Sequence, residues 1–324
     1  MRDCYQRKIT YLRVSVTERC NFRCFYCRPR EGGAASGRDI PLEHLVRVVD
    51  AGTMVGIRKV RLTGGEPLVR KDIVELTARI AGMEGIDDVA LTTNGSLLRR
   101  YTPALQEAGL KRVNISLDTL KPDRFQRITC SGRLQDAWDG IEAALEYGLY
   151  PVKLNTVVMR DVNDDELLDF VALTEKLPLH VRFIEVMPIG ESSERAKGQL
   201  VTAEEIKQGI ESRYGNLEPI KSAAGDGPAR YWKVPGAPGT VGFIAPLSGY
   251  FCDSCNRLRL TASGTLRPCL CQGDELDMND LLTRGASRTE LAALIAEAVT
   301  RKPQGHAEDT IEPVVDRLMS QIGG

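Results

Sequence analysis

The stretch YLRVSVTERCNFRCFYC, residues 11–27, joins a short apolar run to three closely spaced cysteines. Residues 11–16 alternate apolar with polar side chains, a pattern that predicts a β-strand. Cys20, Cys24 and Cys27 come in the segment that follows this strand. In barrel enzymes the loops at the carboxyl ends of the strands hold the active site. This stretch therefore predicts both the first strand of a sheet and the position of a site.

Strand-like and helix-like patterns alternate through the first two thirds of the chain. Five further strand-like segments follow the first, at residues 59–64, 88–93, 112–117, 151–158 and 180–186. The segments between them have helical apolar spacing and several end in glycine, at residues 42–52, 72–82, 97–109, 134–148 and 164–177. Repeated strand-helix units are typical of a parallel sheet. We therefore expect an α/β fold with six such units, an incomplete (β/α)6 TIM-like barrel.

Polar residues occupy one face of several of these strands. Side chains two positions apart in a strand share a face, which groups Arg13 with Ser15, Asn114 with Ser116 and Asp118, and Lys153 with Asn155. A barrel turns its apolar face outward against helices, so this polar face is expected to line the lumen. The alternative is that each of these residues lies near solvent at a strand end. Agreement among several strands favours a lumen that binds a polar ligand.

The composition is that of an ordinary soluble globular protein. The chain has 324 residues, 27% charged and 42% hydrophobic, and a formal net charge of −1, which argues against a nucleic-acid binder. No stretch approaches the roughly 18 to 20 apolar residues of a membrane span, and residues 1–14 show no signal-peptide pattern. We therefore expect a cytoplasmic protein. In a reducing compartment its nine cysteines are expected to be metal ligands or free thiols.

A second region is predicted to begin near residue 190. Small polar segments appear there, followed by two short strand-like runs near residues 231 and 240 that look antiparallel. A second cysteine group follows, Cys252-x2-Cys255-x13-Cys269, with Cys271 two residues later, and helical patterns occupy residues 287–301 and 307–321. We expect a barrel over residues 1–190 and an α+β region over residues 191–324 that closes the barrel mouth.

Each cysteine group offers three clear ligands rather than four. Three thiolates can hold a [4Fe-4S] cluster and leave its fourth iron open for a small molecule, whereas a structural zinc site usually has four protein ligands. By spacing alone, zinc remains an alternative for both groups. Arg257 and Arg259, between the cysteines of the second group, are expected to project together from a strand, and arginine suits forked contacts with phosphate.

Two motifs together resemble the radical S-adenosylmethionine (SAM) superfamily. They are the C-x3-C-x2-C group with Tyr26 before its last cysteine, and the segment Thr63-Gly64-Gly65-Glu66-Pro67 after the second strand. The resemblance implies that SAM chelates the open iron, and that an electron from the cluster cleaves SAM to a 5′-deoxyadenosyl radical. The glycines would let the backbone approach the SAM amino group.

The motifs taken together resemble the MoaA family of GTP 3′,8-cyclases from molybdenum cofactor biosynthesis. Besides the two motifs above, they are LTTNG at 91–95, NISLDTL at 114–120, FCDSCNRLRLTASGTLRPCL at 251–270 and the terminal Gly-Gly. The resemblance implies an incomplete barrel with a SAM cluster and an auxiliary [4Fe-4S] cluster. It also implies the reaction: the 3′-hydrogen of GTP is abstracted, C3′ attacks C8 of guanine, and 3′,8-cyclo-7,8-dihydro-GTP forms.

The resemblance assigns roles residue by residue. The SAM cluster would be held by Cys20, Cys24 and Cys27, and the auxiliary cluster by Cys252, Cys255 and Cys269. SAM would contact Tyr26, Gly65, Ser116 and Met187. GTP would contact Arg13, Arg61, Thr92, Lys153, Arg257, Leu258 and Arg259. Gly323 and Gly324 would take part in catalysis. The family usually has no cysteine two residues after the last ligand, which leaves Cys271 as a bystander or a substitute ligand.

Partners are implied in the same way. They are GTP as substrate, a reduced flavodoxin- or ferredoxin-like electron donor, the next enzyme of the pathway, which receives the product, and a second copy of the chain in a homodimer. Neither nucleic acid nor membrane is expected.

Two other functions account for fewer of these sequence features. A peptide-modifying radical SAM enzyme would explain both cysteine groups but not the Asn-Arg-Leu-Arg pattern. A zinc-dependent nucleic-acid-binding module would explain only the cysteines.

Overall fold

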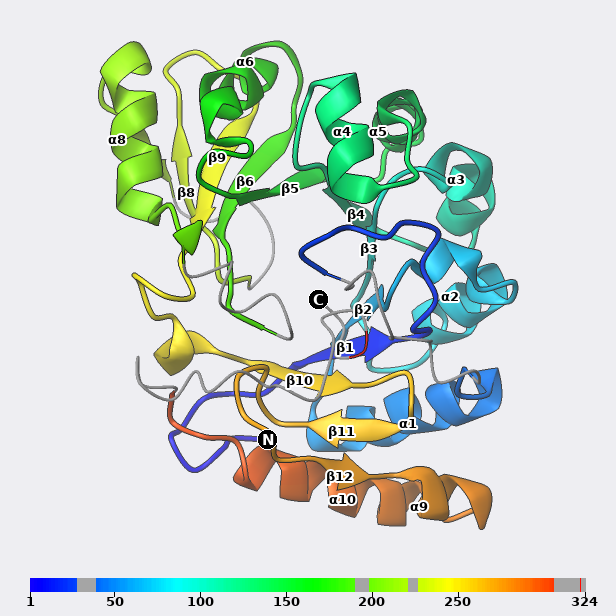
Figure 1. Ribbon diagram of the computed structural model, residues 1–324. Helices are drawn as coiled ribbons and strands as arrows, with labels where there is room; N and C mark the ends of the chain where they lie inside the picture. Colours follow the sequence, from blue (N-terminus) through cyan, green and yellow to red (C-terminus); the bar gives the residue numbers. More distant parts are fainter. Residues whose placement is uncertain (28–38, 190–197, 221–226, 306–320, 322–324) are drawn as a thin grey trace.

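A computed structural model describes residues 1–27, 39–189, 198–220, 227–305 and 321 of the chain. In Figure 1 a curved sheet is flanked by helices on its outer side. The predicted helix over residues 307–321 and the terminal Gly323 and Gly324 lie outside the described residues, apart from Gln321. Among the described residues no helix is long and apolar enough to cross a membrane.

The six predicted strands form the centre of the sheet. They are β1 (Tyr11–Ser15), β2 (Lys59–Thr63), β3 (Asp88–Thr93), β4 (Arg112–Ser116), β5 (Lys153–Val158) and β6 (His180–Glu185). Each pairs in parallel with the next, in sequence order. The predicted strand-helix rhythm and the partial barrel are therefore confirmed.

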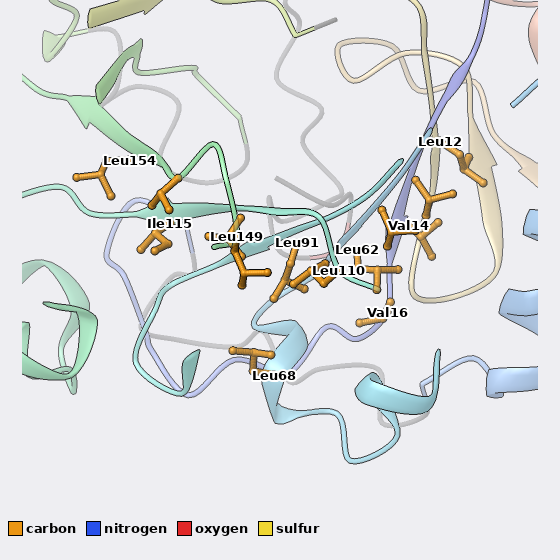
Figure 2. Close-up of a cluster of buried hydrophobic side chains, with 14 of the residues drawn as sticks. Leu12, Val14, Val16, Leu62, Leu68, Leu91, Leu110, Ile115, Leu149 and Leu154 are labelled. Atoms are coloured by element: carbon orange, nitrogen blue, oxygen red, sulfur yellow. The ribbon is translucent and has the colours of Figure 1, made fainter. Parts of the chain in front are cut away.

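Helices follow these strands and cover the outer face of the sheet (Figure 1). They are α1 (Leu42–Val55), α2 (Ile73–Ala81), α3 (Leu98–Glu107), α4 (Pro122–Thr129), α5 (Leu134–Glu146) and α6 (Leu167–Lys176). The apolar strand residues point toward them and form the core, as Figure 2 shows for Leu12, Val14 and Leu62. These three side chains are fully buried. Burial of this face commits the alternate side chains of each strand to the inside of the barrel.

The C-terminal part extends the sheet at both edges. Beside β6 lie β9 (Thr240–Ile244), β8 (Arg230–Lys233) and β7 (Glu218–Ile220), and beside β1 lie β10 (Arg257–Leu260), β11 (Thr265–Arg267) and β12 (Leu276–Asp277). Three helices complete the described part of this region: α8 (Ala203–Tyr214), α9 (Asn279–Thr283) and α10 (Arg288–Thr300). The two short antiparallel strands expected near residues 231 and 240 are confirmed as β8 and β9, and β9 also pairs in parallel with β6.

The pairing of β10 with β1 places the two cysteine groups at opposite ends of the same strands. The two strands are parallel, with Arg259 opposite Arg13. The first group follows the carboxyl end of β1, while Cys255 precedes the amino end of β10. Cys269 follows β11, which is antiparallel to β10, so it returns to that same amino end. The inner face of β1 and β10 therefore runs from one cysteine group to the other.

Candidate functional site

One cavity inside the barrel collects nearly all of the predicted site residues. It has a volume of about 360 Å³. Of the predicted residues, those lining it are Arg13, Cys20, Cys24, Tyr26, Cys27, Arg61, Gly65, Thr92, Ser116, Met187, Cys252, Cys255, Arg257, Arg259 and Cys269. They come from loops at both ends of the strands and from the strands between them. The sequence motifs, which are scattered over the whole chain, thus meet around a single space.

The loop that carries Cys20, Cys24 and Cys27 packs against Gly64 and Gly65, which follow β2. Gly65 N donates to Thr17 O (2.8 Å), and Glu66 N donates to Arg19 O (2.8 Å). A Cβ on Gly65 would lie 2.3 Å from Arg19 O. Contacts this short do not occur between a side chain and a backbone oxygen, so the cysteine loop can take this path only past a glycine. This close approach is a structural reason for the Gly-Gly pair, in addition to the predicted approach to SAM.

Tyr26, which precedes Cys27, is tied to the carboxyl end of β4. Its hydroxyl donates to Asp118 Oδ2 (2.6 Å), while Asp118 Oδ1 accepts from Val157 N (3.0 Å). Burial raises the pKa of Asp118 to about 6, although both hydrogen bonds oppose this shift. Burial also raises the pKa of Cys24. Cys20, Cys24 and Cys27 are half-buried and line the cavity, where coordination of a metal would stabilise their thiolates.

The second group, in contrast, lies among positive charges. Arg257 Nη2 donates to Cys255 Sγ (3.5 Å). Burial would raise the pKa of Cys255, but the charges of Arg257 and Lys302 outweigh it and lower this pKa to about 7. A thiolate is the form that binds metal, so these cations favour ligation here. Lys302 lines the cavity as well and was not singled out in the sequence, because no pattern marks it.

Cys271 is the fourth thiol at this end of the cavity. It is buried, and its thiol donates a hydrogen bond to Cys269. This hydrogen bond lowers the pKa of Cys269 to about 5 and raises the pKa of Cys271. Both thiols therefore lie at this end of the cavity, and Cys269 stays the predicted ligand.

Three arginines form a row between the two cysteine groups; two of them are buried and the third, Arg13, is half-buried. Arg61 on β2, Arg13 on β1 and Arg259 on β10 stand opposite one another in the register of neighbouring strands. Burial lowers the pKa of all three, and the neighbouring guanidiniums Arg259 and Arg61 lower that of Arg13 further. Paired strands lie only about 5 Å apart. Like charges held this close repel each other, and an anion bound among them relieves the repulsion.

Several polar atoms in the cavity wall have no hydrogen-bond partner in the part of the chain that the structure describes. Among the described residues, no hydrogen-bond partner is found for Arg61 Nε, Thr92 Oγ1, Asn155 Oδ1 or Arg182 Nε, although these atoms are buried. Buried polar groups are normally satisfied, so these atoms indicate a polar ligand. Arg182 was missed in the sequence, although its charge between apolar neighbours in β6 was a usable signal.

Two predicted substrate residues do not line the cavity. Leu258 lies between Arg257 and Arg259 in β10, so its side chain points the other way and is fully buried in the core. Only its main chain remains available to a ligand. Lys153 is also buried, with Nζ 5.9 Å from the centre of the Tyr231 ring. Burial and then the charge of Arg182 lower the pKa of Lys153 to about 6.

The donor set at both ends suits iron–sulfur chemistry. Each end brings the three predicted cysteines to the cavity, and three thiolates match a [4Fe-4S] cluster with one open iron. Within the part of the chain that the structure describes, no three His, Cys, Asp or Glu side chains are grouped closely enough to hold a single metal ion. The fit to clusters therefore rests on the cysteines' chemistry and placement.

The fold matches solved structures of two proteins with bound S-adenosylmethionine. SuiB from Streptococcus suis bound to S-adenosylmethionine aligns with a TM-score of 0.59 at 14% identity, over 89% of this chain and 68% of that one. The protein anSMEcpe with bound AdoMet aligns with a TM-score of 0.53 at 13% identity, over 87% and 79%. The Radical SAM superfamily matches residues 14–174. This match contains the cysteine loop and β2 to β5, and it identifies the class of the protein as radical SAM.

Relatives that align over their full length identify the family within this superfamily. The GTP 3′,8-cyclases of Pelotomaculum thermopropionicum and Heliobacterium modesticaldum are both 54% identical to this chain, and that of Moorella thermoacetica is 50% identical. Each alignment covers 100% of both sequences. The family described as Molybdenum Cofactor Synthesis C matches residues 179–308. The chain belongs to the GTP 3′,8-cyclase family.

Replacing Gly65 with alanine tests the close approach of the cysteine loop. Because the new Cβ would collide with Arg19 O, we expect Gly65→Ala to lose the iron at Cys20, Cys24 and Cys27, about half of the total, and to keep the rest. Iron analysis after anaerobic reconstitution measures this. Gly209→Ala, where a Cβ meets only Leu167 Cδ1 at 4.0 Å, is the control and should keep all of its iron. Full iron content in Gly65→Ala would contradict the argument.

Separate substitutions of Cys269 and Cys271 test which thiol is the ligand. Cys269 follows Arg267-Pro268, the position that the family resemblance assigns to the ligand, so Cys269→Ala should lose the auxiliary iron and Cys271→Ala should keep it. Iron and sulfide content of the two proteins decides the matter. Loss of the auxiliary iron in Cys271→Ala alone would reverse the assignment.

Proposed function

We propose that this protein is a radical SAM GTP 3′,8-cyclase that converts GTP to 3′,8-cyclo-7,8-dihydro-GTP in the first step of molybdenum cofactor biosynthesis. The observation that carries this proposal is the row of three arginines inside a cavity that both cysteine groups line. Relatives named GTP 3′,8-cyclase, identical at half or more of their positions, support it. A peptide-modifying radical SAM enzyme would not need three arginines in register.

The two cofactor sites have separate roles in this proposal. Cys20, Cys24 and Cys27 would hold the cluster that binds SAM, and Cys252, Cys255 and Cys269 would hold the auxiliary cluster, each a [4Fe-4S] cluster. When bound, the first cluster supplies the electron that cleaves SAM to the radical that removes the 3′-hydrogen of GTP. Gly65, Ser116 and Met187 line the same end of the cavity as the first three cysteines and would contact SAM.

The strand residues between the two ends would hold the substrate. A triphosphate carries roughly four negative charges, and arginine binds phosphate oxygens through forked, charge-assisted hydrogen bonds. Arg13, Arg61 and Arg259 would neutralise this charge, which removes the repulsion within their row. Thr92 and Arg257 line the same wall and would complete the binding surface. The protein's own contribution is therefore to fix GTP between the two clusters and keep water away from the reacting atoms.

The remaining proposals concern organisation and partners. Residues 1–190 would act as the SAM-binding barrel and residues 191–324 as the part that carries the auxiliary cluster; two family matches, one ending at residue 174 and the other beginning at residue 179, support two functional parts. We place the reaction in the cytoplasm, with a reduced flavodoxin- or ferredoxin-like donor and a homodimeric enzyme that passes its product to the next enzyme of the pathway. The reaction needs an electron from outside the protein, which supports the proposed electron donor.

An anaerobic assay with GTP, SAM and a chemical reductant tests the proposed reaction. We expect 5′-deoxyadenosine and the cyclised nucleotide in equal amounts, identified by mass spectrometry. Cys24→Ala should form neither product and should keep the auxiliary cluster, because its substitution removes a ligand only from the SAM cluster. Undiminished 5′-deoxyadenosine in Cys24→Ala, or no cyclised product from the unmodified protein, would contradict the proposal.

Substitution of Arg257 and Arg259 tests the substrate site. A charge-assisted hydrogen bond to a buried anion contributes about 1.5 to 3 kcal/mol, so each alanine variant should bind GTP roughly tenfold or more weakly. Calorimetric titration of the anaerobic protein with GTP measures this. Arg99→Ala removes an exposed arginine that pairs with Glu142, and it should bind GTP normally. Unchanged affinity in both site variants would show that these arginines do not bind GTP.

We also propose that Gly323 and Gly324 take part in turnover. The described chain reaches the site at Gly305, where a Cβ would lie 3.4 Å from Cys252 Cβ, so the C-terminal segment starts beside a residue that lines the cavity. A protein truncated after Ile322 should keep its iron and its GTP affinity but lose most of its cyclase activity. Product formation at the normal rate by this truncated protein would rule out a role for the two glycines.

A further inference from the structure

Lys302 lies at the junction of the two segments that carry the auxiliary cysteines. It follows α10 and is only 3% exposed. Its Nζ donates to Arg257 O (2.9 Å) and to Pro268 O (2.8 Å). Arg257 follows Cys255 by two residues, and Pro268 immediately precedes Cys269. One ammonium group therefore bridges the backbone beside both cysteines.

The segment that bears Lys302 is also held against the backbone of Cys252, the remaining cysteine of the auxiliary group, through Arg7. Arg7 donates through Nη1 to Cys252 O (2.8 Å) and to Gln304 O (2.8 Å), and through Nη2 to Pro303 O. Asp3 pairs with Arg7 at 2.6 Å and fixes its guanidinium. Because Arg7 holds residues 303 and 304 against the Cys252 backbone, the place of the preceding lysine is set before any ligand binds.

The charge of Lys302 is not neutralised by these hydrogen bonds. Both acceptors are main-chain carbonyls, and burial of an ammonium group is costly unless negative charge lies near it. Burial lowers the pKa of Lys302, and the nearby thiolates of Cys255 and Cys269 oppose this shift. The natural counter-charge for this lysine is therefore an anionic group held by these cysteines.

We propose that Lys302 is a positioning residue of the auxiliary cluster, which fixes the spacing of its cysteine-bearing segments and stabilises its reduced form. The inference rests on the proposed function, since it requires a cluster at Cys252, Cys255 and Cys269. Hydrogen bonds and net charge around an iron–sulfur cluster set its reduction potential. A positive charge that faces the cluster favours the more negative, reduced state and so raises this potential.

The test measures the auxiliary cluster alone, in full-length protein that carries Cys24→Ala. Lys302→Met in this background should give less iron per chain and shift the midpoint potential of the remaining cluster to more negative values in an EPR-monitored redox titration. Lys302→Arg keeps the charge and should restore iron content and most of the potential. Arg301→Ala removes a neighbouring exposed charge, which pairs with Glu297 and Asp274, and should match the reference.

The outcomes separate the inference from the function on which it rests. Complete loss of the cluster in Lys302→Met but not in Lys302→Arg supports the positioning role. Unchanged iron content and potential in Lys302→Met, or equal changes in Lys302→Arg and Lys302→Met, would overturn the inference while leaving the proposed function intact. Absence of any cluster from the Cys24→Ala reference would instead overturn the proposed function, and the inference with it.

Discussion

The parallel pairing of β10 with β1 is the constraint on which the site depends. It brings a strand from residue 257 onward against the first strand of the barrel and sets Arg259 opposite Arg13, which already faces Arg61. Three guanidiniums are thereby held in one row along the cavity wall, and a bound anion relieves their mutual repulsion. The same pairing needs Leu258 in the core, because a strand turns alternate side chains to opposite faces.

The direction of that pairing also separates the two cysteine groups. Because β10 runs parallel to β1, the cysteines before β10 lie at the amino end of the strands and those after β1 at the carboxyl end. An antiparallel arrangement would have placed both groups at one end. A substrate bound to the arginines therefore lies between two cofactor sites whose surroundings differ. The first lies close to Asp118, whereas the second faces Arg257 and Lys302.

Local sequence patterns predicted the strands and the side chains on their inner face. They did not predict which strands distant in the sequence pair with each other. Alternation within strands identified the inner face that carries Arg13, Ser116 and Asn155, because the period of two is a property of each strand by itself. The pairing of β10 with β1 was not predictable in this way, since the periodicity of residues 257–260 does not indicate with which strand they pair. Lys153 is on the correct face but near the start of its strand, where Tyr231 covers it.

The site is explained here by two [4Fe-4S] clusters, each with one open iron, that face one basic cavity. Metal content tests this most directly. Protein that is purified and reconstituted without oxygen should contain about eight iron and eight sulfide ions per chain, four for each [4Fe-4S] cluster. Adding GTP should alter the EPR spectrum of only one of the two reduced clusters, the one at Cys252, Cys255 and Cys269. About four irons per chain, stoichiometric zinc, or spectra that do not respond to GTP would contradict the account.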